Sequence, residues 1–232
     1  MKRTLNCLII IATGYLSLTG SICAQSIAGL FPTIDASWQL NEKKSISTYQ
    51  FYAIPIRSLD SENATLPNWL LYYGEYSANR NLGKKLALSG AYVYQLENIG
   101  NSDVATENRA HVQLKYSATI GKASITGRVR SDNRFIKTPE LATSIYTHRT
   151  RFLAGINVPL NAWTINAYTE FFYNNRSFLN WKLAENWSAI QFRRQIQKNT
   201  YVEFGPLFIG WQTASQQWLK QYYLQTTILF AF

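Results

Sequence analysis

The chain has 232 residues, of which 47% are hydrophobic, 15% aromatic and 16% charged. Charged residues are scarcer and aromatic residues more abundant than in an ordinary soluble domain, and this composition excludes intrinsic disorder. Lysine and arginine outnumber aspartate and glutamate by 23 to 13, which gives a net charge of +10 and favours negatively charged surfaces or ligands as partners.

The start of the chain has the pattern of a secretory signal peptide, which we expect to be cleaved after Ala24. Lys2 and Arg3 form a basic start, residues 5–18 are mostly apolar, and Ala24 is the small residue that a cleavage site requires. The apolar stretch is interrupted and falls short of the ~20 residues that a membrane-spanning helix needs. We therefore expect residues 1–24 to be absent from the mature chain.

Cleavage has two consequences for the chemistry of the mature chain. It removes Cys7 and Cys23, so we expect neither a disulfide nor a thiolate metal site. Lipidation of Cys23 is the alternative, but the bulky Ile22 before it fits that processing poorly. Cleavage also removes two basic residues and no acid, leaving 23 − 2 = 21 basic against 13 acidic residues, a net charge of +8. Because the protein is exported, we expect no nucleic-acid partner.

Alternation of apolar and polar residues dominates the mature sequence and predicts β-strands. In residues 108–118 the even-numbered positions are mostly apolar and the odd-numbered positions are polar, and residues 123–130 show the opposite phase. Gly121 and Lys122 between them predict a tight turn. The pattern predicts ten strands, near residues 45–57, 68–79, 85–96, 107–119, 122–135, 144–158, 163–174, 187–196, 200–212 and 219–232.

Tight turns and longer polar connections alternate between these runs, as in a transmembrane barrel with short turns on one side and long loops on the other. Most runs have 11–14 residues, which suits the ~9–11 tilted residues that cross a bilayer better than the ~5–6 of a sandwich strand. A soluble, exported all-β sandwich or barrel is the alternative. Aromatic residues near predicted strand ends indicate interfacial girdles: Phe135, Tyr146, Trp163, Tyr173, Trp187 and Tyr222.

Residues 25–44 precede the ten runs and contain one more candidate strand, residues 34–41. A single-chain bacterial barrel has an even number of strands, so we interpret residues 25–44 as a periplasmic lead-in or a partial strand. The predicted fold is therefore all-β, a ten-stranded antiparallel transmembrane barrel over residues 45–232. A twelve-stranded barrel that also uses residues 26–41 is the alternative.

Several short motifs recur in a known family. They include Asp35-Ala-Ser-Trp38, Gly127-Arg-Val-Arg130, Tyr146-Thr-His-Arg-Thr-Arg151, Asn166-Ala-Tyr-Thr-Glu-Phe-Phe172 and the terminal Phe232. With them the chain resembles the Gram-negative outer-membrane family catalogued as domain of unknown function 2490. The resemblance implies a location in the cell envelope and a β-barrel, and it implies no activity. Ser131-Asp132 stands where such proteins often have a glutamate between paired arginines, so their ion-pair geometry is not carried over.

Charged residues fall on the face opposite the apolar one in most of the predicted strands. Charged side chains at bilayer depth are tolerated where they face protein or water, so this phase predicts the barrel lumen. Most of these residues are basic. The predicted lumen residues are Glu75, Glu107, Arg109, His111, Lys115, Arg128, Arg130, Asp132, Arg134, Arg149, Arg151, Glu170, Arg193 and Glu203.

The preferred interpretation of this lumen is a polar plug, in which arginines pair with carboxylates and fix the strand register, so that the barrel has a structural or passive role. The interior of about ten strands is barely wider than its side chains. The alternative is a narrow anion-preferring, porin-like pore, or a pocket for an anionic ligand, in which Arg128, Arg130, Arg149 and Arg151 bind carboxylate or phosphate.

A lipid-modifying enzyme is a second alternative, and it would depend on His148. This residue shares its face with Thr150 on the lipid side, just after a long outward loop, which is similar by analogy to the site of a barrel lipid A deacylase. No carboxylate partner is evident, so we expect a chance placement of the histidine and assign no catalytic residue. His111 has the inward phase, and we expect it to hydrogen-bond to the charged network.

The remaining signals concern cofactors, metals and assembly. The sequence has no phosphate-binding glycine loop, zinc-ligand cluster or EF-hand loop, so we expect no cofactor and no metal. The last strand ends on an aromatic residue, which resembles the recognition signal of the outer-membrane insertion machinery. We expect this machinery and outer-membrane lipid as partners, with the oligomeric state left open. The predicted assembly signal is Tyr222, Leu224, Ile228, Phe230 and Phe232.

Overall fold

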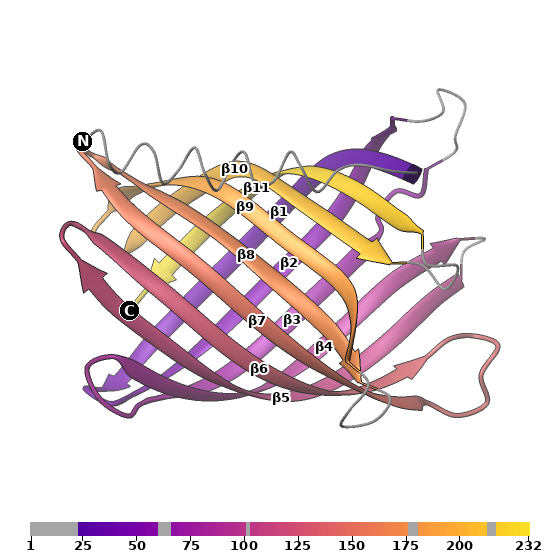
Figure 1. The fold of residues 1–232 in the computed structure, drawn as a ribbon, viewed down its shortest axis with the longest axis horizontal. Helices are drawn as coiled ribbons and strands as arrows, with labels where there is room; N and C mark the ends of the chain where they lie inside the picture. The colour runs from indigo at the N-terminus through magenta and orange to yellow at the C-terminus, as the bar shows by residue number, and fades with distance from the viewer. Residues whose placement is uncertain (1–22, 60–65, 101–102, 176–180, 213–216) are drawn as a thin grey trace.

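One closed β-barrel contains all the strands. The computed structural model describes residues 23–59, 66–100, 103–175, 181–212 and 217–232, and within these ranges the barrel has eleven strands (Figure 1). The strands are β1 (Cys23–Asn41), β2 (Lys44–Ser58), β3 (Leu71–Asn81), β4 (Leu86–Gly100), β5 (Asp103–Ile120), β6 (Ala123–Lys137), β7 (Ile145–Leu160), β8 (Trp163–Asn175), β9 (Trp181–Gln197), β10 (Thr200–Gln212) and β11 (Trp218–Ala231).

The closure of the barrel differs from the prediction. Sequential strands pair antiparallel, and β1 pairs with β11 in a parallel ladder that runs from Ser26↔Lys220 to Ser37↔Ala231. The Phe232 backbone extends this seam, because its N–H donates to the Ser37 carbonyl (2.8 Å) and its carbonyl accepts from the Gln39 N–H (2.7 Å). Two strands that run in the same direction close the sheet, so the number of strands is odd.

The predicted counts of ten and twelve strands are therefore wrong, and so is the interpretation of residues 25–44 as a lead-in or partial strand. Residues 23–41 form a full strand of the barrel, which is hydrogen-bonded to β2 along one edge and to β11 along the other. The error came from requiring an even number of strands, a rule that assumes antiparallel closure. Most of the predicted signal peptide, residues 1–22, lies outside the described residues, and its cleavage stays a prediction.

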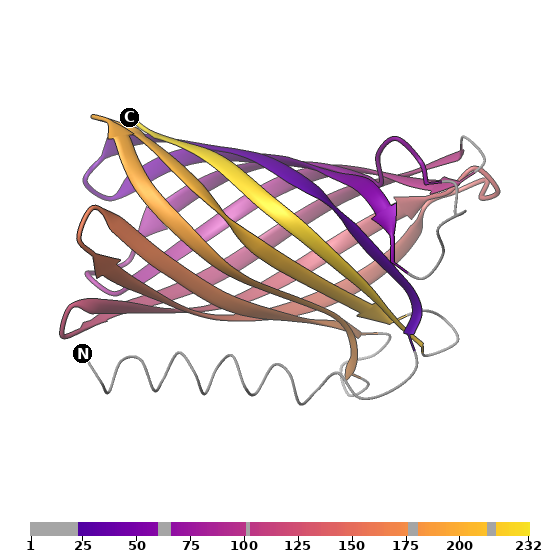
Figure 2. The same ribbon diagram turned by 90° about the horizontal axis from the view of Figure 1, so that it is seen from above.

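Short turns lie at one end of the barrel, together with the C-terminus (Figures 1 and 2). The strand ends that precede and follow the longer connections lie at the other end, which we call the long-loop end. Among the short turns, Gly121 has a φ of 61° and Asn161 a φ of 54°. Two-residue hairpins need such positive φ values, which glycine and asparagine adopt most readily. The predicted turn at Gly121-Lys122 is where the structure has it. Parts of four predicted long loops, residues 60–65, 101–102, 176–180 and 213–216, lie outside the described residues.

The two faces of the sheet have different chemistry. Large apolar side chains are exposed on the outer face of strands all around the barrel, for example Ile34, Tyr76, Val112, Phe204 and Leu224. The opposite face of the same strands is buried inside and carries both the charged residues and a cluster of aromatic and aliphatic side chains. In the described ranges, no helix is long and apolar enough to span a membrane.

Glycine 29 tests whether β1 is part of the wall. A Cβ atom built on Gly29 would lie 2.2 Å from the Ile54 carbonyl oxygen and 2.8 Å from a Tyr223 ring carbon. We therefore expect Gly29→Val to lower the free energy of unfolding by about 1–3 kcal/mol, as overpacking does elsewhere. The measurement is urea unfolding followed by circular dichroism. The matched control is Gly127→Val, since a Cβ at Gly127 meets nothing within 4 Å. Equal stability of the two variants would contradict a structural role for β1.

Candidate functional site

The candidate site is the barrel interior. Every second residue of each strand points inward, so β3 to β9 bring charged side chains from distant parts of the sequence together. We call the arginine–carboxylate ion pairs between the centre of the barrel and its long-loop end the lumen network. Its members are Glu75, Glu107, Arg109, Arg128, Arg130, Asp132, Arg134, Arg149, Arg151, Glu170 and Glu185.

Asp132 lies at the centre of the lumen network, with its side chain fully buried. Arg130 donates from Nε to Oδ1 at 2.8 Å, and both atoms belong to β6. Arginines from the two neighbouring strands approach Oδ2: Arg109 Nη1 lies 3.7 Å away and Arg151 Nη1 lies 3.9 Å away. Arg130 and Arg151 are direct cross-strand partners, so two positive charges lie opposite each other. The Asp132 carboxylate offsets their repulsion and lies near guanidinium groups from three adjacent strands.

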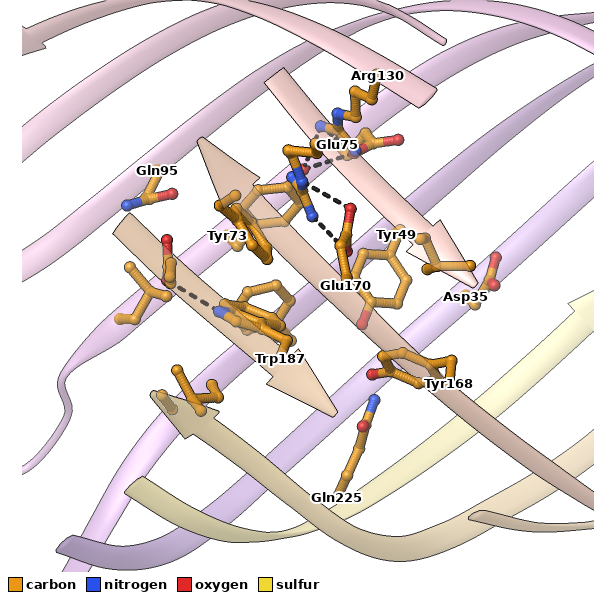
Figure 3. Close-up of a pocket in the computed structure, with 18 of the residues that line it drawn as sticks. Asp35, Tyr49, Tyr73, Glu75, Gln95, Arg130, Tyr168, Glu170, Trp187 and Gln225 are labelled. Atoms are coloured by element: carbon orange, nitrogen blue, oxygen red, sulfur yellow. Dashed lines mark hydrogen bonds and ion pairs between the residues drawn. The ribbon is translucent and has the colours of Figure 1, made fainter. Parts of the chain in front are cut away.

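Two further carboxylates, Glu170 and Glu75, pair with guanidinium N–H groups that do not face Asp132. Arg151 donates to Glu170 through two bonds, Nε to Oε1 (2.8 Å) and Nη2 to Oε2 (2.9 Å), and Arg128 Nη2 donates to the same Oε1 at 2.7 Å. Arg130 Nη2 lies 3.0 Å from a Glu75 oxygen. Forked contacts of this kind are the strongest ion pairs that arginine makes. Figure 3 labels Glu75, which lies beside Arg130, and Glu170, which comes from a different strand.

A second group of ion pairs lies toward the long-loop end of the barrel. Arg134 forms a fork with Glu107 through bonds of 2.7 and 2.6 Å, and Arg109 Nε donates to Glu107 Oε1 at 2.8 Å. Arg149 Nη1 donates to Glu185 at 2.9 Å. On the opposite side of Asp132, toward the short turns, Arg193 Nε donates to Glu203 at 2.6 Å. The ion pairs therefore occupy successive levels of the lumen.

His111 is buried between two carboxylates of the network. Its ring nitrogens lie 3.7 Å from Glu75 and 3.8 Å from Asp132, and neither nitrogen has a hydrogen-bond partner among the described residues. The expectation that His111 hydrogen-bonds to the charged network is therefore wrong. The physical reason is competition, because guanidinium groups make shorter, charge-assisted bonds to the same carboxylates.

Aromatic rings fill the part of the lumen beside the network. Phe31 stacks on Phe51 with ring centroids 4.3 Å apart, and Phe51 stacks on Tyr73 at 4.8 Å. Trp187, on the far wall, contacts the edge of Phe31 at 5.8 Å. The rings of β1, β2 and β3 thus meet a ring of β9 across the interior. The prediction that Trp187 belongs to an interfacial girdle is wrong, because β9 begins at Trp181 and Trp187 points inward from its middle.

The aromatic rings and the lumen network are joined directly. The Arg151 guanidinium carbon lies 4.1 Å from the centre of the Phe172 ring, and Phe172 in turn packs on Trp187 at 5.6 Å. The Tyr73 hydroxyl donates to Glu75 Oε2 at 2.5 Å and accepts from Arg130 Nη2 at 2.9 Å. Cation–π contacts and hydrogen bonds therefore make one continuous cross-linked layer inside the barrel.

The described lumen contains equal numbers of basic and acidic side chains, because the strands are longer than predicted and bring further acids into the interior. The predicted set holds eight basic side chains and five acids. Within the described ranges, the lumen also contains Asp35, Glu97 and Glu185, which raises the acids to eight. Sequence reasoning missed these three because Asp35 lay in the supposed lead-in, while Glu97 and Glu185 lay in supposed loops. The interior is therefore neutral and not basic.

A cavity of about 960 Å³ remains along the lumen. Besides network residues it is lined, toward the short turns, by Asp35, Lys115, Tyr168, Arg193 and Glu203, and Figure 3 labels Asp35 and Tyr168. In the described part of the chain, no three histidine, cysteine, aspartate or glutamate side chains are placed to hold a metal ion.

The residues predicted for a lipid-side enzyme site and for the assembly signal lie on the outer face. The Ser131 hydroxyl lies 2.9 Å from His148 Nε2, so a serine accompanies this histidine in addition to the predicted Thr150, which is buried on the same face. On β11, Tyr222, Leu224, Ile228 and the terminal Phe232 are exposed and Phe230 is half-buried. Phe232 stacks on Trp38 of β1 with centroids 5.9 Å apart. Their role as an assembly signal stays a prediction.

Comparison with known proteins adds a family and no activity. The model of a family described as Protein of unknown function (DUF2490) matches residues 38–219, which is more than half of the chain. A search of curated proteins finds no match.

Removal of the central carboxylate charge should destabilise the barrel. We expect Asp132→Asn to lower the free energy of unfolding by about 3–5 kcal/mol, because it leaves buried arginines without their shared counter-charge. The measurement is urea unfolding of the purified protein. The control is Asp103→Asn, the same chemical change at the start of β5 where the side chain is only half-buried. A loss below 1 kcal/mol at Asp132 would show that the network does not support the fold.

Proposed function

The chain belongs to the family described as Protein of unknown function (DUF2490), and we propose that it is an integral outer-membrane β-barrel whose lumen is closed by its own ion pairs and aromatic rings. In this proposal the barrel has a structural or passive role in the membrane and does not conduct ions. The observation that carries it is the neutral, cross-linked interior inside a wall whose outer face is apolar.

The outer face supports a membrane location. Exposed large apolar residues occur on all eleven described strands, whereas a monomeric soluble protein rarely exposes a contiguous apolar patch above a few hundred Å². The strands have 11 to 19 residues, enough for the ~9–11 tilted residues that cross a bilayer. The signal-peptide pattern of residues 1–24 supports export, and the terminal residues of β11 fit the recognition signal of the outer-membrane insertion machinery.

The interior supports closure. An eight-stranded barrel is just filled by its own side chains, and an eleven-stranded barrel is wider. Here long arginines and large aromatic rings cross part of the additional width, as the Arg151–Phe172–Trp187 contacts illustrate, and a cavity of about 960 Å³ remains beside them. Selection of anions needs an excess of positive charge along the path. The equal numbers of acidic and basic side chains in the described lumen remove the reason to expect an anion-preferring pore.

Lipid exposure of the outer wall can be tested with one charge. Leu224 is exposed in the middle of β11, and Leu224→Arg should reduce assembly into membranes by about 2–4 kcal/mol if that position lies at the bilayer midplane. Folding into vesicles, followed by the shift of the folded band on unheated gels, measures this loss. Ile120→Arg at the end of β5 is the control, because it lies beside a short turn. Equal, undiminished folding of both variants into the vesicles would contradict the membrane location.

Closure can be tested by conductance in planar bilayers. We expect the wild-type protein to give no discrete channel events, because ion pairs and rings block the lumen. The double variant Arg151→Ala/Phe172→Ala removes a joined cation and ring and should produce measurable events, while Arg80→Ala at the exposed end of β3 should stay silent. Reproducible anion-selective events from the wild-type protein would overturn the closed-lumen proposal.

A further inference from the structure

Ser131 and His148 form a hydrogen-bonded pair on the outer face of the barrel. They belong to neighbouring strands, β6 and β7, in which Ser131 pairs with Thr150 and Asn133 pairs with His148. Their side chains are therefore diagonal neighbours on one face of the sheet. The Ser131 Oγ lies 2.9 Å from His148 Nε2, within the distance at which a histidine activates a serine.

The surroundings of this pair are apolar and aromatic. Val129, Phe135 and Tyr146 are exposed on the same face, and the rings of Phe135 and Tyr146 lie 5.5 Å apart near the long-loop end. An ionisable side chain on a lipid-facing surface is costly, and such residues usually serve a function. Aromatic rings on this face favour the depth of the membrane interface, where the ester groups of lipids lie. His148 is the next residue after Tyr146 on that face.

A third polar group completes the arrangement. Asn133 follows Ser131 by two residues on the same strand face, and the Tyr146 hydroxyl donates to its Oδ1 at 2.8 Å. This bond fixes the side-chain amide so that its Nδ2 remains the donor. An amide donor next to a nucleophile can stabilise the negative oxygen that develops during acyl transfer.

We propose that Ser131 and His148 are the nucleophile and the general base of an esterase that hydrolyses acyl esters of membrane lipids from the outer wall of the barrel. The choice of a lipid substrate rests on the proposed membrane location. The lumen takes no part in this activity, which therefore adds a function to the closed barrel.

The reaction proceeds in two balanced halves. The Ser131 oxygen bonds to the ester carbonyl carbon while its proton passes to His148 Nε2. The bond between that carbon and the alcohol oxygen then breaks, and His148 returns the proton to the departing alcohol. Water next attacks the acyl-serine, gives a proton to His148 and releases the fatty acid as the proton returns to Ser131. The net reaction converts ester and water into acid and alcohol, with no oxidant, metal or other reactant.

The test uses a long-chain alkyl fluorophosphonate, which bonds covalently to activated serines even where turnover is slow. The full-length protein, folded in detergent, is treated with the probe and the modified residue is identified by peptide mass spectrometry. We expect labelling at Ser131. Ser131→Ala and His148→Gln should each reduce labelling at least about a hundredfold, the usual contribution of a general base. His148→Gln retains a hydrogen-bonding group beside Ser131, so a purely structural pair would tolerate it.

Two controls keep the result interpretable. Thr226→Ala removes an exposed outward hydroxyl on β11 and should label like the wild-type protein. Each variant is also checked for the folded band on unheated gels. Folded wild-type protein without label at Ser131, or equal labelling of folded wild type and His148→Gln, would overturn the proposed activity.

The substrate is tested separately from the membrane location. Release of fatty acid is measured from phosphatidylethanolamine vesicles and from vesicles that contain lipopolysaccharide, and the arm that releases acid identifies the lipid. Cell fractionation shows whether the protein resides in the outer membrane. Labelling without a membrane location would overturn the lipid substrate and the proposed function but leave the esterase. Membrane location without labelling would overturn the esterase alone.

Discussion

The structure depends on the pairing of charges inside a closed sheet. Once β1 and β11 join, the inward side chains of β3 to β9 have no route to bulk solvent except along the lumen, so each guanidinium needs a carboxylate within reach. Asp132, fully buried, meets this need for arginines from three adjacent strands. Strand register and ion pairing are therefore the same constraint, because a slip of one residue would turn Asp132 toward the outer face.

The aromatic rings occupy space that ion pairs alone would leave in a barrel of this width. Ion pairs alone would leave more space in an eleven-stranded lumen, and the rings from β1 to β3 and from β8 and β9 fill part of it. Arg151 belongs to both systems, since it is forked to Glu170 and lies over the Phe172 ring. The interior is consequently polar in composition and cross-linked by ion pairs and ring contacts, with a cavity of about 960 Å³ beside them, while the proposed chemistry lies on the outer wall at Ser131 and His148.

Period-two alternation in the sequence predicted the strand centres, the inward phase of the arginines and the turn at Gly121, because each depends on neighbouring residues only. Strand ends were predicted too short, since cross-strand hydrogen bonds extend β4 and β9 into polar segments, and this hid Glu97 and Glu185. The parallel pairing of β1 with β11 joins strands from opposite ends of the chain, so no pattern of neighbouring residues could predict it. The Ser131–His148 contact likewise depends on the register of two strands, and alternation alone pairs His148 only with Thr150.

Cysteine accessibility tests the central claim, a closed charged interior behind a lipid-facing wall, most directly. Single cysteines replace Ser77, which is buried beside the lumen cavity and close in size to cysteine, and Val112, which is exposed on the outer face. The chain's own cysteines are changed to serine, and the protein is placed in vesicles. The account predicts that a membrane-soluble maleimide modifies position 112 while a charged, water-soluble maleimide modifies neither position. Rapid reaction of position 77 with the charged reagent would reveal an open water path, and rapid reaction of position 112 with it would place the outer wall in water.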